Sequence, residues 1–203
     1  MASGEGSSPD LSFARDLPIT RRAIAFAQDL HGGQRRAADR APFLVHPLEV
    51  ASYLERSGCP DHVVAAAVLH DVLEDTDADR RQLESLFGRQ VSELVATVSD
   101  NPAIGDEEQR KDDVRERVRN AGPDALVVHA ADKVSKVREL RMLLAGGLDS
   151  HAAAVRLRRY RKSLEMLERT IPGDRVVELL RFELEALETL PPEPPGPLGG
   201  ASA

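Results

Sequence analysis

The segment from Val63 to Leu69 constrains the fold more than any other part of the sequence, because every residue in it is Val, Ala or Leu. A helix of this composition is apolar on nearly every side, so other elements have to surround it. Asp61 stands just before the segment, where its carboxylate can cap the N-terminus of the helix. The segment therefore predicts a central helix buried inside a bundle.

Apolar residues recur at helical spacing on both sides of this segment, and no stretch alternates as a half-buried strand would. One helix is expected to end at His31-Gly32-Gly33, where the glycines permit a left-handed cap. Another starts near Pro47, which a first helical turn tolerates, and ends at Ser57-Gly58. Further helices are expected over residues 83–87, 91–98, 123–144, 150–170 and 173–189, and the highly charged segment 106–120 is expected to be a mobile part of the surface. We therefore predict an all-α fold, a single-domain helical bundle of about eight or nine helices.

The composition supports this fold and excludes several classes of protein. Aromatic residues make up only 3% of the chain and Trp is absent, so Leu, Val and Ala must fill the core. The net charge of -7 gives no general attraction to nucleic acid or to an anionic membrane, and no run approaches the roughly 18 apolar residues of a membrane span. Cys59 is the only cysteine, which excludes an intrachain disulfide and favours a reducing, cytoplasmic location. Residues 1–17 and 191–203 are rich in Gly, Ser, Pro and Ala and are expected to be disordered tails around a domain of residues 18–190.

Two imidazoles and two carboxylates form the chemically most informative group: His46, His70, Asp71 and Asp132. Nitrogen and oxygen donors of this kind bind divalent cations such as Mn²⁺, Fe²⁺ or Zn²⁺. His70 and Asp71 interrupt an apolar helix, where burying them is costly unless they are paired or bind a metal. Each residue also has a simpler interpretation, since His46 could occupy a helix N-terminus and Asp132 could pair with an arginine. Together the four residues predict a metal site.

Two acidic residues follow the His-Asp pair at helical spacing. Glu74 comes four residues after His70, and Asp75 comes four residues after Asp71, so each pair shares a face if the helix continues. Carboxylates in these positions can exchange protons with a water bound to the metal. A solvated acidic turn is the alternative interpretation. We predict that Glu74 and Asp75 are catalytic.

Longer stretches of the sequence resemble the HD-superfamily hydrolase domain of RelA/SpoT proteins, particularly the stand-alone small alarmone hydrolases. The matching segments are Ala23–Ala27, His31 with Gln34–Arg36, Pro42–Ala51, His70–Thr76, Phe87–Gly88 and Ala131–Lys133. The resemblance covers residues 18 to 170 approximately, with spacing typical of the family. It implies an HD-type helical bundle for the domain of residues 18–190.

The resemblance also implies an activity, namely hydrolysis of the 3′-diphosphate of guanosine tetra- or pentaphosphate to release pyrophosphate. It implies that Glu74 and Asp75 serve the attacking water, and that Arg36 stacks on the nucleotide base. A planar guanidinium is suited to such stacking, although a solvated loop charge is the alternative for Arg36. The ligands that the resemblance implies for a manganese ion are His46, His70, Asp71 and Asp132.

The departures from the family pattern lie where a nucleotide would bind. Ala37 and Phe43 stand where the family usually has lysine and tyrosine, and Lys136 stands where it usually has asparagine. An ammonium group only donates hydrogen bonds whereas an amide also accepts them, so Lys136 could bind a substrate phosphate instead. Tyr160 is near a tyrosine that relatives use for ligand contact, in a basic run over residues 156–162 that could also be a solvated helix face.

Three functions therefore stay open. The first is a Mn²⁺-dependent (p)ppGpp 3′-pyrophosphohydrolase. The second is an HD phosphohydrolase of another phosphorylated nucleotide, such as NADPH, and the third is a non-catalytic metal or nucleotide-binding module. The expected partner is a small phosphorylated nucleotide, with no nucleic acid and no membrane, and the sequence does not indicate an oligomeric state. The remaining histidines are expected to be structural or exposed: His31, His62, His129 and His151.

Overall fold

The central helix predicted from the sequence is α3 (Asp61–Leu69) of the computed structural model, which describes residues 11–189. Each residue from Val63 to Leu69 is 0% exposed. The helices that enclose α3 are α1 (Pro18–Leu30), α2 (Val45–Arg56), α6 (Arg89–Val98) and α8 (Pro123–Ala145). This burial explains why a helix without a polar face is stable here, since apolar surface on every side is removed from water.

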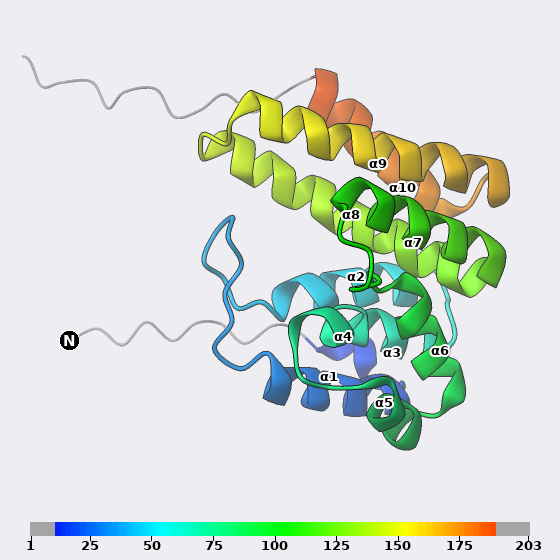
Figure 1. The fold of residues 1–203 in the computed structure, drawn as a ribbon. Helices are drawn as coiled ribbons and strands as arrows, with labels where there is room; N and C mark the ends of the chain where they lie inside the picture. Colours follow the sequence, from blue (N-terminus) through cyan, green and yellow to red (C-terminus); the bar gives the residue numbers. More distant parts are fainter. Residues whose placement is uncertain (1–10, 190–203) are drawn as a thin grey trace, which may run out of the picture.

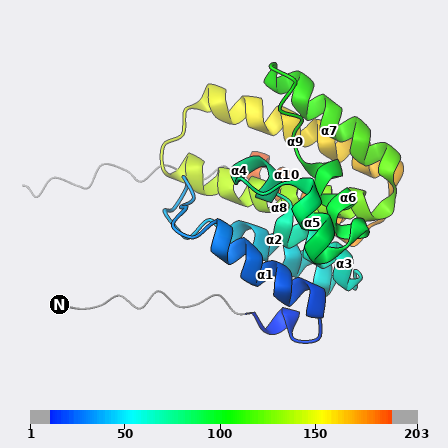
Figure 2. The same ribbon diagram turned by 60° about the horizontal axis from the view of Figure 1, so that its bottom comes forward.

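The long helix α8 lies between two groups of helices. It contacts α2, α3 and α6 on one side, and it contacts the remaining long helices on the other. Those helices are α7 (Glu107–Ala121), α9 (Ser150–Thr170) and α10 (Arg175–Thr189). Figure 1 shows α8, α9 and α10 stacked along the upper part of the molecule and α1, α3 and α5 in the lower part, and Figure 2 shows α8 between α1 and α9. Side chains on α8 can therefore reach both groups.

The all-α prediction is confirmed. Residues 11–189 form ten α-helices, of which the shortest are α4 (Val72–Asp75) and α5 (Arg80–Phe87), and the only β-type pairing among them is an isolated bridge between Arg35 and Pro42. Gly33 has a φ of 98°, the left-handed conformation expected after the first helix. Within the described part of the chain, no helix combines the length and the apolar character that crossing a membrane requires.

Two expectations need correction. The N-terminal tail was expected to extend to residue 17, but Ser12–Ala14 form a 3-10 helix in which Ala14 is buried against the core. Asp61 was expected to cap α3, but its carboxylate accepts hydrogen bonds from the backbone N–H groups of Ile19 and Thr20, at 2.8 and 2.9 Å. Those donors belong to the first turn of α1, which has no capping side chain of its own. The rest of the expected tails, residues 1–10 and 191–203, lies outside the described residues, as does residue 190 at the end of the expected domain.

Candidate metal centre and adjoining cavity

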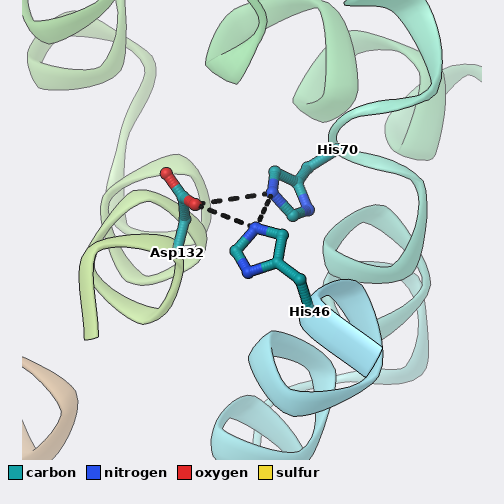
Figure 3. A group of neighbouring side chains, drawn as sticks. All are labelled: His46, His70 and Asp132. Carbon is teal, nitrogen blue, oxygen red and sulfur yellow. Dashed lines mark hydrogen bonds and ion pairs between the residues drawn. The ribbon is translucent and has the colours of Figure 1, made fainter. Parts of the chain in front are cut away.

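Four side chains from separate parts of the chain meet beside the middle of α8. His46 lies in the first turn of α2, as the sequence predicted, and Asp132 lies in α8. His70 and Asp71 lie between the end of α3 and the start of α4. None of the four is more than 7% exposed. Figure 3 shows that His46 from α2, His70 from the turn after α3 and Asp132 from α8 point toward one another.

The helix that leads to His70 does not continue unbroken to Glu74, as the spacing argument assumed. Helix α3 ends one residue before His70, and the four-residue helix α4 starts at Val72. His70 Nδ1 donates a hydrogen bond to the Ala67 carbonyl at 2.7 Å, and the His70 carbonyl accepts one from Ser99 Oγ at 3.2 Å. Such bonds from side chains compete with the helical ladder, which accounts for the break.

The donor atoms of His46, His70 and Asp132 are spaced as ligands of one ion would be, and Asp71 lies beside the two histidines. His46 Nε2 is 3.1 Å from His70 Nε2, and Asp132 Oδ1 is 3.3 and 3.5 Å from these two nitrogens. Asp71 lies 3.2 Å from His70 Nε2 through Oδ1 and 3.4 Å from His46 Nε2 through Oδ2. Ligands about 2.1 Å from a shared ion, at angles of about 90° to 110°, are roughly 3.0 to 3.4 Å apart. The geometry therefore suits a single divalent cation.

The bonding of the donor atoms also suits a cation. Asp132 Oδ1 is buried and accepts no hydrogen bond from residues 11–189, although Lys136 Nζ forms an ion pair with it at 3.1 Å. Burial favours the neutral acid, but the ammonium groups of Lys133 and Lys136 hold the pKa of Asp132 well below its usual range, so it is ionised. Because His70 Nδ1 carries the proton that it donates to Ala67, neutral His70 has a lone pair on Nε2. The expected alternative for Asp132, an ion pair, is thus present as well, with lysines in place of an arginine.

Glu74 and Asp75 lie differently relative to the metal centre. Glu74 lines the cavity beside the centre and accepts a hydrogen bond from the Asp100 N–H at 2.8 Å. Asp75 lines a neighbouring surface depression together with Glu74, and both residues are exposed. Although the residues are exposed, the protein removes part of the water around each carboxyl group, which raises its pKa, and the negative charge of Asp71 raises it further. Of these two acids, Glu74 is therefore the one that shares a cavity with the predicted ligands.

The cavity beside the metal centre has a volume of about 290 Å³. Lys136 from α8 and Tyr160 from α9, two of the residues that the sequence suggested for substrate binding, line it. Arg36 does not line it, because the loop between α1 and α2 holds this side chain, 9% exposed, in hydrogen bonds to Asp39. The structure thus brings Lys136 and Tyr160 to the metal centre and leaves Arg36 apart from it.

Several cavity residues were not singled out from the sequence. His129 was expected to be structural or exposed, and it is buried in the cavity wall with Nε2 3.1 Å from Ser163 Oγ. Burial holds the pKa of His129 well below its usual value, so this imidazole is neutral. Lys111 stands four residues before Arg115, so the two share a face of a helix, but their segment was expected to lie on the surface. The basic side chains that line the cavity beside Lys136 are Lys111, Arg115, Lys133, Arg156 and Arg159.

Comparison with known proteins identifies relatives of this chain. A family model described as an HD domain matches residues 23–170. The mouse guanosine-3′,5′-bis(diphosphate) 3′-pyrophosphohydrolase MESH1 is 36% identical over 132 residues, which cover 64% of this chain and 73% of that protein. A probable enzyme of the same name from Synechocystis is 45% identical over 78 residues, which cover 38% of this chain and only 10% of that longer protein.

Solved structures agree with the sequence comparison. A metazoan orthologue of SpoT, described as hydrolysing ppGpp, matches with a TM-score of 0.73 and 26% identity over 91% of this chain and 99% of that one. The protein lmo0812 of Listeria monocytogenes matches with a TM-score of 0.59 and 26% identity over 70% of this chain and 98% of that one. These matches confirm the resemblance to RelA/SpoT hydrolase domains. The chain belongs to the HD-domain family.

Proposed function

We propose that this protein is a metal-dependent phosphohydrolase that removes the 3′-diphosphate of guanosine 3′,5′-bis(diphosphate), and of the corresponding pentaphosphate, as pyrophosphate. One observation carries the proposal: three of the predicted metal ligands, His70, Asp71 and Asp132, line the same cavity as Glu74 and a set of basic side chains, and His46 lies directly behind them. A substrate with several phosphates needs both an ion to activate water and cations to bind it. MESH1 and the SpoT orthologue are described by the same activity.

The metal centre would supply the nucleophile. A divalent ion held there would lower the pKa of a bound water and polarise the phosphoryl group. We propose Mn²⁺, which accepts mixed nitrogen and oxygen ligands. Fe²⁺ and Zn²⁺ accept the same donors and are the alternatives. The ligands that we propose are His46, His70, Asp71 and Asp132.

The acids near the centre would handle protons. Glu74 and Asp75 would take a proton from the attacking water and return it to the leaving group, so no covalent nucleophile is required. The raised pKa of Glu74 brings this carboxyl closer to neutral pH, where proton exchange is most effective. Glu74 would act from the cavity wall that it lines, and Asp75 would act from the neighbouring depression.

The basic cavity wall would bind the nucleotide. Lys136 and Tyr160 would contact the substrate from α8 and α9. Lys111 and Arg159 would bind the phosphates in exchange for their present partners, which are Asp100 for Lys111 and Glu107 and Glu108 for Arg159. Arg36 would contact the base only after exchanging its hydrogen bonds with Asp39 for the ligand. We place the activity in the cytoplasm, because the lone Cys59 and a nucleotide substrate both suit a reducing compartment.

The test is an assay of purified protein with Mn²⁺ and guanosine tetraphosphate. We expect release of pyrophosphate and GDP, loss of turnover after chelation of the metal, and loss of turnover in Asp71→Ala. Asp77→Ala is the matched control, because Asp77 is exposed on the same acidic turn and should leave turnover unchanged. Equal turnover in Asp71→Ala and the wild type would overturn the proposal.

A second candidate is hydrolysis of another phosphorylated nucleotide, such as NADPH. It is favoured by two residues that differ from the usual RelA/SpoT pattern at the expected nucleotide-binding positions. Lys136 is paired with Asp132, and the centroid of the Phe43 ring lies 4.7 Å from that of the His31 ring. Competition between nucleotides for one enzyme preparation separates the candidates. A kcat/KM for NADPH above that for guanosine tetraphosphate would favour the second, and tight binding without any product would favour a binding module.

A further inference from the structure

His46 makes a contact on the side of its ring that faces away from the metal centre. Its Nε2 faces His70, and its Nδ1 lies 2.9 Å from Ser135 Oγ in α8. The Ser135 hydroxyl lies in turn 2.6 Å from Glu49 Oε2, one turn after His46 in α2. Ser135 is 1% exposed, so this chain of contacts is shielded from water.

The chemistry of the three groups fixes the direction of both hydrogen bonds. A hydroxyl has one proton to donate, and an ionised carboxylate can only accept. Ser135 therefore donates to Glu49 and has to accept the proton on His46 Nδ1. A neutral imidazole protonated on Nδ1 has its lone pair on Nε2, the atom that faces the metal centre.

Glu49 is itself held by further side chains. Its Oε1 accepts hydrogen bonds from the Tyr53 hydroxyl at 2.5 Å and from Arg138 Nη1 at 3.3 Å. Arg138 also binds Glu183 of α10, with 2.8 Å between Arg138 Nε and Glu183 Oε1. These bonds keep Glu49 ionised against the effect of burial and lower its pKa. The acceptor for Ser135 is thus fixed in position and in charge.

We propose that Ser135 and Glu49 are positioning residues that select the His46 tautomer and ring orientation required for metal binding. The inference rests on the metal site of the proposed function, but not on the identity of the substrate. Partners of this kind, bonded to the outer nitrogen of a ligating histidine, change metal affinity about 10- to 100-fold when they are removed.

The test compares Mn²⁺ affinity by calorimetry in metal-stripped protein, with circular dichroism to check folding. We expect Ser135→Ala to raise the Kd by roughly 10- to 100-fold and Glu49→Gln to raise it by a smaller factor. The double variant should bind no more weakly than Ser135→Ala, because Glu49 acts on His46 only through Ser135. Ser52→Ala is the matched control, since among residues 11–189 its hydroxyl bonds only to the Glu49 carbonyl within α2.

Three results would overturn the proposal: a Kd of folded Ser135→Ala within twofold of the wild type, losses that add in the double variant, or a comparable loss in Ser52→Ala. If Ser135→Ala does not fold, long-range ¹⁵N–¹H NMR of the metal-free wild type replaces it. That spectrum should show His46 protonated on Nδ1 and bare on Nε2, and the opposite tautomer would refute the role. Because these readouts involve no nucleotide, they stay valid whether or not the protein hydrolyses guanosine tetraphosphate.

Discussion

Lys136 shows how a single side chain can act on both the ion and the substrate. Its Nζ lies 3.1 Å from Asp132 Oδ1, the carboxylate oxygen that also faces the two imidazoles. Burial would lower the pKa of Lys136, but the carboxylates of Asp132 and Asp71 hold it well above its usual value. The ammonium is therefore charged, and it competes with a cation for the same oxygen.

Replacing Lys136 by asparagine, the residue usual in RelA/SpoT hydrolases, should strengthen metal binding. Loss of a positive charge beside Asp132 removes both repulsion and competition, and we expect the Kd for Mn²⁺ to fall about tenfold, which corresponds to about 1.4 kcal/mol. Calorimetry measures this, and Lys162→Asn is the control because Lys162 pairs with Glu108 and does not line the cavity. An unchanged or higher Kd in Lys136→Asn would contradict the prediction.

The pH dependence of turnover should report Glu74. Because loss of solvent around its carboxyl group raises its pKa above the ordinary 4.5, Glu74 becomes protonated and loses its capacity as a base at a higher pH than a fully solvated glutamate. The value of kcat/KM should therefore fall on acidification through a pKa above 4.5. Glu74→Gln should lower kcat by about 10²- to 10⁴-fold and remove this acidic limb, whereas Glu84→Gln on α5 should keep the wild-type profile.

At the scale of helices, local pattern was sufficient where burial follows the helical period. The apolar stripes of α1, α2 and α8 located these helices, because each buries one continuous face. Contacts between distant segments were beyond such reasoning. The position of Asp61 in the sequence suggested a cap for its own helix, but its carboxylate binds the free N–H groups at the start of α1 instead. Likewise, the basic residues of α7 face the cavity only because α7 packs on α8 and α9.

The cap that Asp61 provides can be tested by stability. Asp61→Ala removes hydrogen bonds to Ile19 N, Thr20 N and Thr20 Oγ1, and we expect the free energy of unfolding in urea to fall by about 2 kcal/mol. Asp16→Ala, which changes an exposed acid just before α1, should alter it by less than about 0.5 kcal/mol. Equal stability of the two variants would show that the cap contributes nothing.

At the scale of the whole molecule, the sequence located the candidate ligands but not their surroundings. His46, His70, Asp71 and Asp132 stood out because polar groups in apolar helices need partners. Three features depend on how α2, α8 and α9 pack: the cavity, the hydrogen bonds between Arg36 and Asp39, and the network behind His46. The spacing of residues along the sequence carries no information about this packing. Packing around α8 thus determines both stability and site.

That dependence predicts a large effect of truncating the core of α8. Leu140 is 0% exposed, and Leu140→Ala should lower the free energy of unfolding by about 2 to 5 kcal/mol through lost burial and a cavity. Leu86→Ala, at a position that is 37% exposed, should change it by less than about 1 kcal/mol. Urea unfolding of both variants provides the comparison, and similar losses would mean that α8 is not central to the core.

Only α8 contributes both to the basic wall of the cavity and to the proposed ion site, and the other basic side chains of the wall come from helices that hold no proposed ligand. α7 and α9 contribute Lys111, Arg115 and Arg159 to the cavity, whereas the ion would be held from α2, α8 and the junction after α3. Exchanges along α7 and α9 can therefore alter which nucleotide is accepted while the hydrolytic machinery stays intact. A fold of this kind can acquire a new specificity through substitutions in the cavity wall alone, without any change in the residues that would hold the ion.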